Sequence, residues 1–268
     1  MNVHEELGHA WQGDPEFMMS LARGLAVLRC FADHEQPMTI AQLSQLTTLG
    51  RSAVRRCLYT LVKLGYAAQE GQRYVLRPKA LSLGYAYVSS GSLAAVAQPL
   101  LDRLRDELGE SCSVGVMAED QICYIARAEA SRIMSVALRA GSRLPLYATS
   151  MGRVLLAGSA RSEQEAYLRR TDLRPLTPKT EQSRDGLLEI LGRVAEQGFA
   201  IVDQELEVGL RSIAVPIVGS AGIVAAMNVG APAARVSKAD LRTRILPALH
   251  RTAQRLAADV RRIPAPLA

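Results

Sequence analysis

The sequence predicts an α+β protein with an N-terminal winged helix-turn-helix, a linker helix and a larger C-terminal sensor domain. Its 268 residues exceed one average domain, and 49% of them are hydrophobic, which is enough to form ordinary cores. Positive charge is concentrated near the N-terminus, since residues 20–79 contain nine basic and three acidic residues. A compact basic unit joined to a nearly neutral remainder is typical of a protein that binds nucleic acid through one domain.

These patterns divide the chain into four parts. We expect an N-terminal arm at 1–19, a winged helix-turn-helix at 20–77, a linker helix at 78–91 and an effector-binding domain at 92–263. The arm is acidic and contains no lysine or arginine, which is opposite to a signal peptide, and the four cysteines form no C-x-x-C pair. Both features favour a location in the reducing cytoplasm.

The N-terminal part follows the order of a helix-turn-helix. From Ser20, the spacing of Leu21, Leu25, Leu28 and Phe31 predicts a first helix with these side chains on its buried face. Thr39 and Gln42 match a capping box that opens a short second helix. The segment 47–50 then predicts a tight turn, in which Gly50 is available for an unusual backbone angle.

The third helix is expected to begin at Arg51 or Ser52 and to bind DNA. Its apolar residues recur at helical spacing, which leaves five others on the outer side: Arg51, Ser52, Arg55, Arg56 and Tyr59. Arginine can bind guanine edges with two hydrogen bonds, and hydroxyls can reach phosphates or bases. After it, a Glu70-Gly71 turn between two strands predicts a wing, where Arg73 is a candidate phosphate contact. The alternative for each residue is an ordinary solvated charge.

Pro78 opens the predicted linker helix, with Leu81, Tyr85 and Val88 on one face.

In the second half, a helix at 93–108 precedes a hairpin with strands at 113–117 and 122–126. A helix near 185–197, strands near 199–202, 213–218 and 223–229, and a final helix capped by Ser237 and Asp240 follow. The uncharged stretch 212–234 is long enough to span a bilayer, but its central Gly219-Ser220-Ala221-Gly222 turn predicts two strands of a hairpin instead.

With these elements placed, the chain resembles the IclR family of bacterial regulators over nearly its whole length, and most closely its PcaR/PcaU/PobR-like branch. The resemblance rests on RSAVRRCLYTLVKLGY, on RIMSVALRAGSRLPLYATSMGRVLLAGS and on VDQELEVGLRSIAVPI. It implies a GAF-like effector domain and assembly as a homodimer or a dimer of dimers. The branch implies double-stranded operator DNA and control by an acid such as protocatechuate, 4-hydroxybenzoate or β-ketoadipate. Many relatives outside the branch have histidine at the position of Tyr147 and a small residue at that of Met151. The effectors of those relatives are therefore a poor guide to the effector of this chain.

The candidate effector site is the loop LYATSMGR, which leads into an apolar helix. Unpaired amides at a helix start bind carboxylates, and Thr149, Ser150 and Met151 are positioned to supply them; a simple side-chain cap is the alternative. By resemblance, the facing wall contains Asp203, Ser212, Ile213 and Asn228. Tyr147 is a candidate for stacking on an aromatic ring, and Arg143 and Arg211 are candidate countercharges or plain surface residues.

A hydrolase is the competing interpretation, because Ala148-Thr149-Ser150-Met151-Gly152 imitates a nucleophile elbow around Ser150. The only histidine in the second half is His250, within the final helix, so a catalytic triad is not expected. No metal-ligand spacing, G-x-G-x-x-G sequence or P-loop is present. We therefore expect neither catalysis, nor a metal, nor a cofactor, nor membrane insertion.

Overall fold

The computed structural model describes residues 14–31, 34, 36–83, 93–130, 138–220 and 222–260. The chain forms two compact units, one within Met1–Tyr87 and the other within Val88–Ala268. Each unit has a hydrophobic core of its own. The finer four-part division at 1–19, 20–77, 78–91 and 92–263 stays a prediction.

The first unit is a winged helix-turn-helix. Three helices, α2 (Met19–Cys30), α3 (Ile40–Thr47) and α4 (Arg51–Lys63), accompany a small sheet with the order β1-β3-β2. Its strands are β1 (Met38–Thr39), β2 (Ala67–Glu70) and β3 (Arg73–Leu76), and β2 and β3 form the expected antiparallel wing. The predicted capping box is present, since the backbone amide of Gln42 donates to Thr39 Oγ1 and that of Thr39 donates to Gln42 Oε1.

The turn between α3 and α4 differs from the prediction in one residue. Thr48, not Gly50, adopts the left-handed conformation, with φ of 57°, while Gly50 has φ of −60° and precedes α4 in an extended conformation. The Thr48 hydroxyl donates to the carbonyl of Thr47, and that of Ser44 donates to the carbonyl of Leu49. Local hydrogen bonds from side-chain hydroxyls thus hold a turn for which a glycine was expected.

The buried face of α2 was predicted correctly at Phe31 but wrongly at Leu21 and Leu25. Ala26, Val27 and Phe31 lie in the core, whereas Leu21 and Leu25 are half exposed and line a shallow apolar groove beside α4. Helical spacing identifies which residues share a face, but not whether that face is covered. The linker begins with a short 3₁₀ turn, η1 (Pro78–Ala80), and the predicted positions of Tyr85 and Val88 lie outside the described residues.

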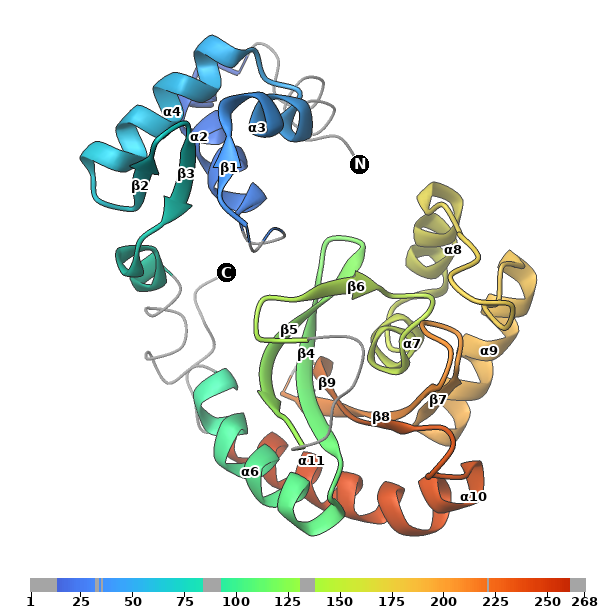
Figure 1. Cartoon of the computed structure of the whole chain (residues 1–268). Helices are drawn as coiled ribbons and strands as arrows, with labels where there is room; N and C mark the ends of the chain where they lie inside the picture. The colour runs from blue at the N-terminus through green and yellow to red at the C-terminus, as the bar shows by residue number, and fades with distance from the viewer. Residues whose placement is uncertain are drawn as a thin grey trace. The chain divides into compact units, whose positions relative to one another are not determined.

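The second unit is built on a strongly curved six-stranded sheet with the order β6-β5-β4-β9-β8-β7 (Figure 1). All neighbouring strands are antiparallel, which confirms the α+β class. The strands are β4 (Ser111–Ala118), β5 (Gln121–Ala128), β6 (Arg143–Pro145), β7 (Ala200–Asp203), β8 (Leu210–Gly219) and β9 (Gly222–Pro232). The stretch considered as a membrane span is the β8–β9 hairpin, and no helix in the described parts of the chain is long and apolar enough to cross a bilayer.

Helices cover both faces of this sheet and create two cores. On one face pack α6 (Leu93–Leu108) and α11 (Leu246–Val260), which follows α10 (Lys238–Asp240) and a π turn at Leu241–Ile245. On the concave face pack α7 (Ser150–Ala157) and α9 (Arg184–Gln197), with α8 (Arg161–Arg170) beside them (Figure 1). Sequence analysis did not identify α8 or the short β6. The concave face is the one that carries the cavity described next.

Candidate effector cavity and DNA-binding surface

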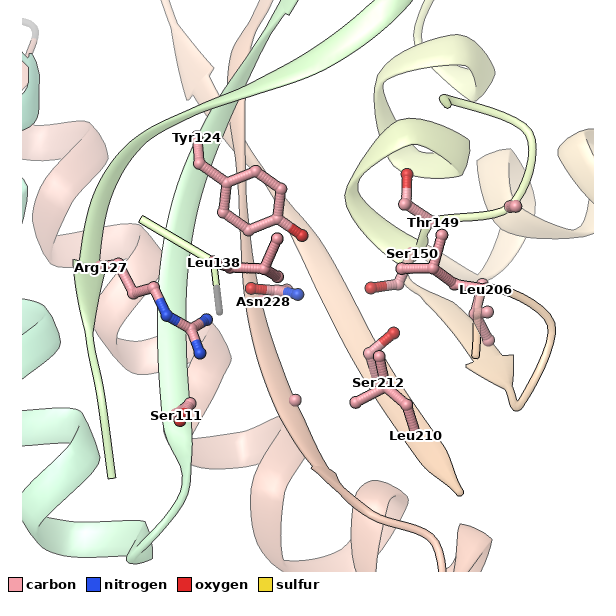
Figure 2. Close-up of a pocket in the computed structure, with 13 residues that line it drawn as sticks. Ser111, Tyr124, Arg127, Leu138, Thr149, Ser150, Leu206, Leu210, Ser212 and Asn228 are labelled. Atoms are coloured by element: carbon pink, nitrogen blue, oxygen red, sulfur yellow. The ribbon is translucent and has the colours of Figure 1, made fainter. Parts of the chain in front are cut away.

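A cavity lies on the concave face between the sheet and the start of α7 (Figure 2). Strands β4, β5, β7, β8 and β9, the Ala148–Ser150 segment and the β7–β8 loop contribute its walls. The lining residues are Ser111, Tyr124, Arg127, Leu138, Ala148, Thr149, Ser150, Val202, Leu206, Leu210, Ser212, Asn228 and Gly230. Seven of these thirteen residues have polar side chains and the other six are apolar or glycine, so the walls combine apolar surface with groups that can orient a small molecule.

A bulge in β5 brings Tyr124 and Arg127 to the same face. Val114 of β4 pairs with Ala126 and Gly115 pairs with Tyr124, so Ile125 has no opposite residue. In a regular strand, residues three positions apart point to opposite faces. The extra residue reverses this alternation and directs the Arg127 side chain into the cavity. Bulges near functional sites commonly change the direction of a side chain in this way.

Arg127 brings a buried positive charge to the cavity without a full set of partners. Its side chain is 9% exposed, its Nη1 donates to Ser113 Oγ at 3.1 Å, and its Nη2 lies 3.6 Å from the carboxylate of Glu129. Among the described residues, neither Nε nor Nη2 finds a hydrogen-bond partner. Since leaving a buried charged donor unpaired costs free energy, these two nitrogens are prepared to bind an anion.

Two further polar groups in the cavity wall have no partner within the part of the chain that the structure describes. Ser150 and Asn228 are both buried, and there neither Ser150 Oγ nor Asn228 Oδ1 makes a hydrogen bond. Ser150 is the first residue of α7, whose cap is Thr149: its Oγ1 accepts from the amide of Gly152 at 3.2 Å. Helix geometry gives the amides of Ser150 and Met151 no partner within the helix, so this end adds positive potential.

Together these groups suit a ligand with a carboxylate and a second polar group. Figure 2 shows Arg127 and Ser150 on opposite sides of the cavity, with Asn228 between them and the Tyr124 hydroxyl above. Burial raises the pKa of Tyr124 to about 12, although Arg127 opposes this shift. The phenol is therefore neutral at physiological pH and able to donate a hydrogen bond.

Four of the eight predicted effector residues line this cavity: Thr149, Ser150, Ser212 and Asn228. Tyr147, Met151 and Ile213 lie outside its wall, and the contact of each predicted residue with an effector stays a prediction. Met151 is fully buried in the core beneath α7, and the Tyr147 hydroxyl donates to the carbonyl of Arg174. Ile213 packs in the core on the other face of the sheet, because it follows Ser212 in a regular strand.

Asp203 is also not part of the cavity wall, and neither proposed countercharge is available. Asp203 accepts from Arg211 Nε at 2.7 Å and lies 3.1 Å from Lys238 Nζ. Burial alone would raise the pKa of Asp203, but its hydrogen bonds from Arg211, Lys238 and Gln204 hold that pKa well below its usual range. Arg143 pairs with Glu119.

Arg127 was not predicted as a site residue. The bulge that directs its side chain inward is visible in the pairing of β4 with β5 but not in the residue pattern of β5 alone.

The predicted DNA-binding residues of α4 share an exposed surface. Arg51, Ser52, Arg55, Arg56 and Tyr59 are all exposed, while Val54 and Leu58 are fully buried beneath them. On the wing, Arg73 is exposed and its Nη1 donates to the carbonyl of Pro37 at 2.9 Å. This bond fixes the Arg73 side chain across β1 and β3, and the contact of each of these residues with DNA stays a prediction.

The hydrolase alternative has no support in the site. His250 lies on α11, which packs against the opposite face of the sheet from Ser150 on α7. A serine needs a base within hydrogen-bond reach to act as a nucleophile. Within the described residues, no group of three or more histidine, cysteine or acidic side chains is arranged to hold a metal ion.

A winged helix-turn-helix joined to a domain with a polar-anchored cavity defines the class of transcription regulators that respond to a small molecule. Comparison with known families then identifies the group within this class. Residues 20–71 match the family described as the IclR helix-turn-helix domain, and residues 85–258 match the bacterial transcriptional regulator IclR C-terminal domain. The chain belongs to the IclR family, whose members are DNA-binding regulators and not enzymes.

Individual relatives support the branch suggested by the sequence. The chain is 50% identical over 242 residues to the Pca regulon regulatory protein of Pseudomonas putida, covering 90% of this chain and 83% of that protein. It is similar to the structure of a protein described as a transcriptional regulator from Rhodococcus sp. RHA1, with a TM-score of 0.81, 46% identity and coverage of 91% and 98%.

A third relative was solved with a ligand. It is a double mutant of the inducer-binding domain of the PobR transcription factor from Acinetobacter, in complex with 3-hydroxybenzoic acid. Its TM-score is 0.59 at 31% identity, covering 61% of this chain and 97% of that one.

Proposed function

We propose that this protein controls transcription of genes for aromatic-acid catabolism in response to a small aromatic or dicarboxylic acid. The observation that carries the proposal is the cavity with three buried polar side chains, Arg127, Ser150 and Asn228, whose hydrogen-bonding capacity the described residues fill only in part. The relatives support the metabolic assignment, because one is named for the Pca regulon and another holds 3-hydroxybenzoic acid. We also propose a cytoplasmic location, because the DNA that such a regulator binds lies in the bacterial cytoplasm.

Within the cavity, we assign the ligand carboxylate to Arg127 and a second polar group to the start of α7. The guanidinium offers Nε and Nη2, and two parallel charge-assisted hydrogen bonds are the strongest common way to hold a carboxylate. On the other side, Ser150 Oγ and the first amides of α7 can hold a hydroxyl or a second carboxylate. Leu206, Leu210 and Tyr124 provide apolar surface for the body of the ligand between these ends.

On the DNA side, we propose that α4 enters the major groove and that the chain acts as a homodimer or a dimer of dimers. The exposed arginines of α4 support the first point. A helix-turn-helix reads only a few base pairs, so two copies on neighbouring half-sites give the required affinity and specificity.

Calorimetry tests the proposal with four acids: protocatechuate, 4-hydroxybenzoate, β-ketoadipate and glyoxylate. We expect at least one of the first three to bind more tightly than glyoxylate, which is too small to reach both ends of the cavity. The same acid should raise the melting temperature and change affinity for the protein's own promoter in a mobility shift, because binding at two linked sites is reciprocal. Absence of binding by all four acids would refute the effector assignment.

A further inference from the structure

Arg153 is almost fully buried on α7, yet it does not line the cavity. Its side chain is 2% exposed, and its Nε donates to the carbonyl of Tyr147 at 2.8 Å. Its other two nitrogens donate to the two carboxylate oxygens of Glu205, with Nη1 at 2.8 Å from Oε1. One guanidinium therefore joins three segments: the strand-to-helix loop before α7, α7 itself and the β7–β8 loop.

Two of these segments supply cavity walls. The carbonyl of Tyr147 immediately precedes Ala148, Thr149 and Ser150, and Glu205 is followed directly by Leu206. The β7–β8 loop, at 204–209, also leads into Leu210 and Ser212 of β8. Two neighbouring segments on the Ser150 side of the cavity are thus held against each other by a buried bidentate ion pair whose members do not line the cavity.

The β7–β8 loop depends on such contacts to keep its shape. Gln204 has a positive φ of 64°, a conformation that costs free energy for a residue with a side chain. The hydroxyls of Thr177 and Thr180 donate to the carbonyls of Gln204 and Glu205 at 2.7 and 2.6 Å. The amide of Glu181 donates to Glu205 Oε2 at 3.2 Å. Any outward movement of the loop would leave the buried cation of Arg153 without its anion.

We propose that Arg153 and Glu205 are positioning residues that fix the shape of the cavity wall formed by the start of α7 and the β7–β8 loop, and so determine the affinity and size selectivity of the effector without touching it. The proposal rests on the proposed function of the cavity. Its physical basis is preorganisation: a loop already fixed in the binding geometry spends no binding free energy on ordering itself. Separating Arg153 from Glu205 would leave a buried charge unpaired, which costs free energy, so the ion pair keeps the β7–β8 loop against α7.

The test uses a double variant, Arg153→Met with Glu205→Leu, in the full-length protein. Replacing both members of a buried ion pair by apolar side chains of similar size is often neutral for stability, whereas replacing only one leaves the other charge buried without a partner and destabilises the protein. The matched control is Arg170→Met with Asp120→Asn, because this pair is also bidentate but joins α8 to the β4–β5 turn. Circular dichroism and thermal melting establish that each variant is folded.

Two measurements then separate a positioning role from a merely structural one. Hydrogen exchange should speed up at least about tenfold for amides of the 204–209 loop in the double variant and remain unchanged in the β8–β9 hairpin, which corresponds to a local opening. Calorimetry should show about tenfold or greater weakening of the tightest acid among protocatechuate, 4-hydroxybenzoate and β-ketoadipate. The ratio of its dissociation constant to that of glyoxylate should approach one. The control variant should match the wild type in both.

The outcomes distinguish this inference from the proposed function. If wild-type protein binds none of these acids, the proposed function fails, whatever the exchange data show. If wild-type protein binds an acid and the folded double variant binds it equally well with the same size selectivity, the positioning role is overturned. Unchanged hydrogen exchange in the 204–209 loop of the double variant would also overturn the positioning role. If the double variant does not fold, the exchange and affinity measurements are made on Arg153→Lys, which keeps the charge but loses the bidentate geometry.

Discussion

Replacing Arg127 by methionine should strongly weaken effector binding without destabilising the protein. The guanidinium is 9% exposed and has one hydrogen bond to Ser113, while two of its nitrogens have no hydrogen-bond partner among the described residues. Removing one member of a desolvated charge pair typically costs about 2–5 kcal/mol of binding free energy. Because about 1.4 kcal/mol corresponds to a factor of ten, the effector affinity should fall roughly 30-fold to several thousand-fold.

Stability should respond differently, and this contrast makes the prediction specific. An apolar side chain of similar length removes a buried charge that is only partly paired, so the free energy of unfolding should change by no more than about 1 kcal/mol in either direction. A structural arginine would instead show a clear loss. Calorimetry with the tightest acid and urea unfolding measure the two quantities in parallel.

Two variants control this experiment. Arg127→Lys keeps the charge but not the planar guanidinium and should retain part of the affinity. Arg143→Met removes an arginine of the same domain that is paired with Glu119 and does not line the cavity, so it should bind like the wild type. If Arg127→Met binds the acid within about threefold of the wild type, the placement of the carboxylate is wrong, since 2 kcal/mol corresponds to about thirtyfold.

Three other measurements test separate parts of the molecule. The double change Arg55→Ala with Arg56→Ala should weaken operator binding in a mobility shift by about 1–3 kcal/mol for each of the two arginines that binds a base, and unchanged binding would remove α4 from the recognition role. Glu129→Gln removes the carboxylate 3.6 Å from the cavity guanidinium and should tighten effector binding in calorimetry by about 0.2–1 kcal/mol; weaker binding would contradict competition between the two anions. Asp203→Asn should lower the free energy of unfolding at pH 7 by about 1.5–3 kcal/mol while leaving effector affinity unchanged. Because the pKa of Asp203 is depressed in the folded state, its stabilisation is present above the unfolded value of about 4 and is lost as the pH falls below it. Urea unfolding should therefore show the difference disappearing in acid, and a difference that persists there would refute the ionic explanation.

Local sequence determined most of the elements of this protein, with α8 and β6 as exceptions. The Thr39–Gln42 capping box, the start of α4 at Arg51 and the turn at Glu119-Asp120 are each formed by residues within a few positions of one another. The energy of such features depends on neighbours in the chain, so a pattern is enough to identify them. The same holds for the exposed arginine face of α4, which follows from helical periodicity once the opposite face is apolar.

The tertiary structure alone decided which side chains meet. Sequence alternation could not show that one unpaired residue, Ile125, turns Arg127 toward Ser150, which follows it in the chain by 23 positions. Nor could it show that Asp203 is already neutralised by Arg211 and Lys238, or that Leu21 lies half exposed on α2. Each of these depends on which strand lies beside which and on whether a face is covered, and those are properties of the packed sheet and helices rather than of any local stretch.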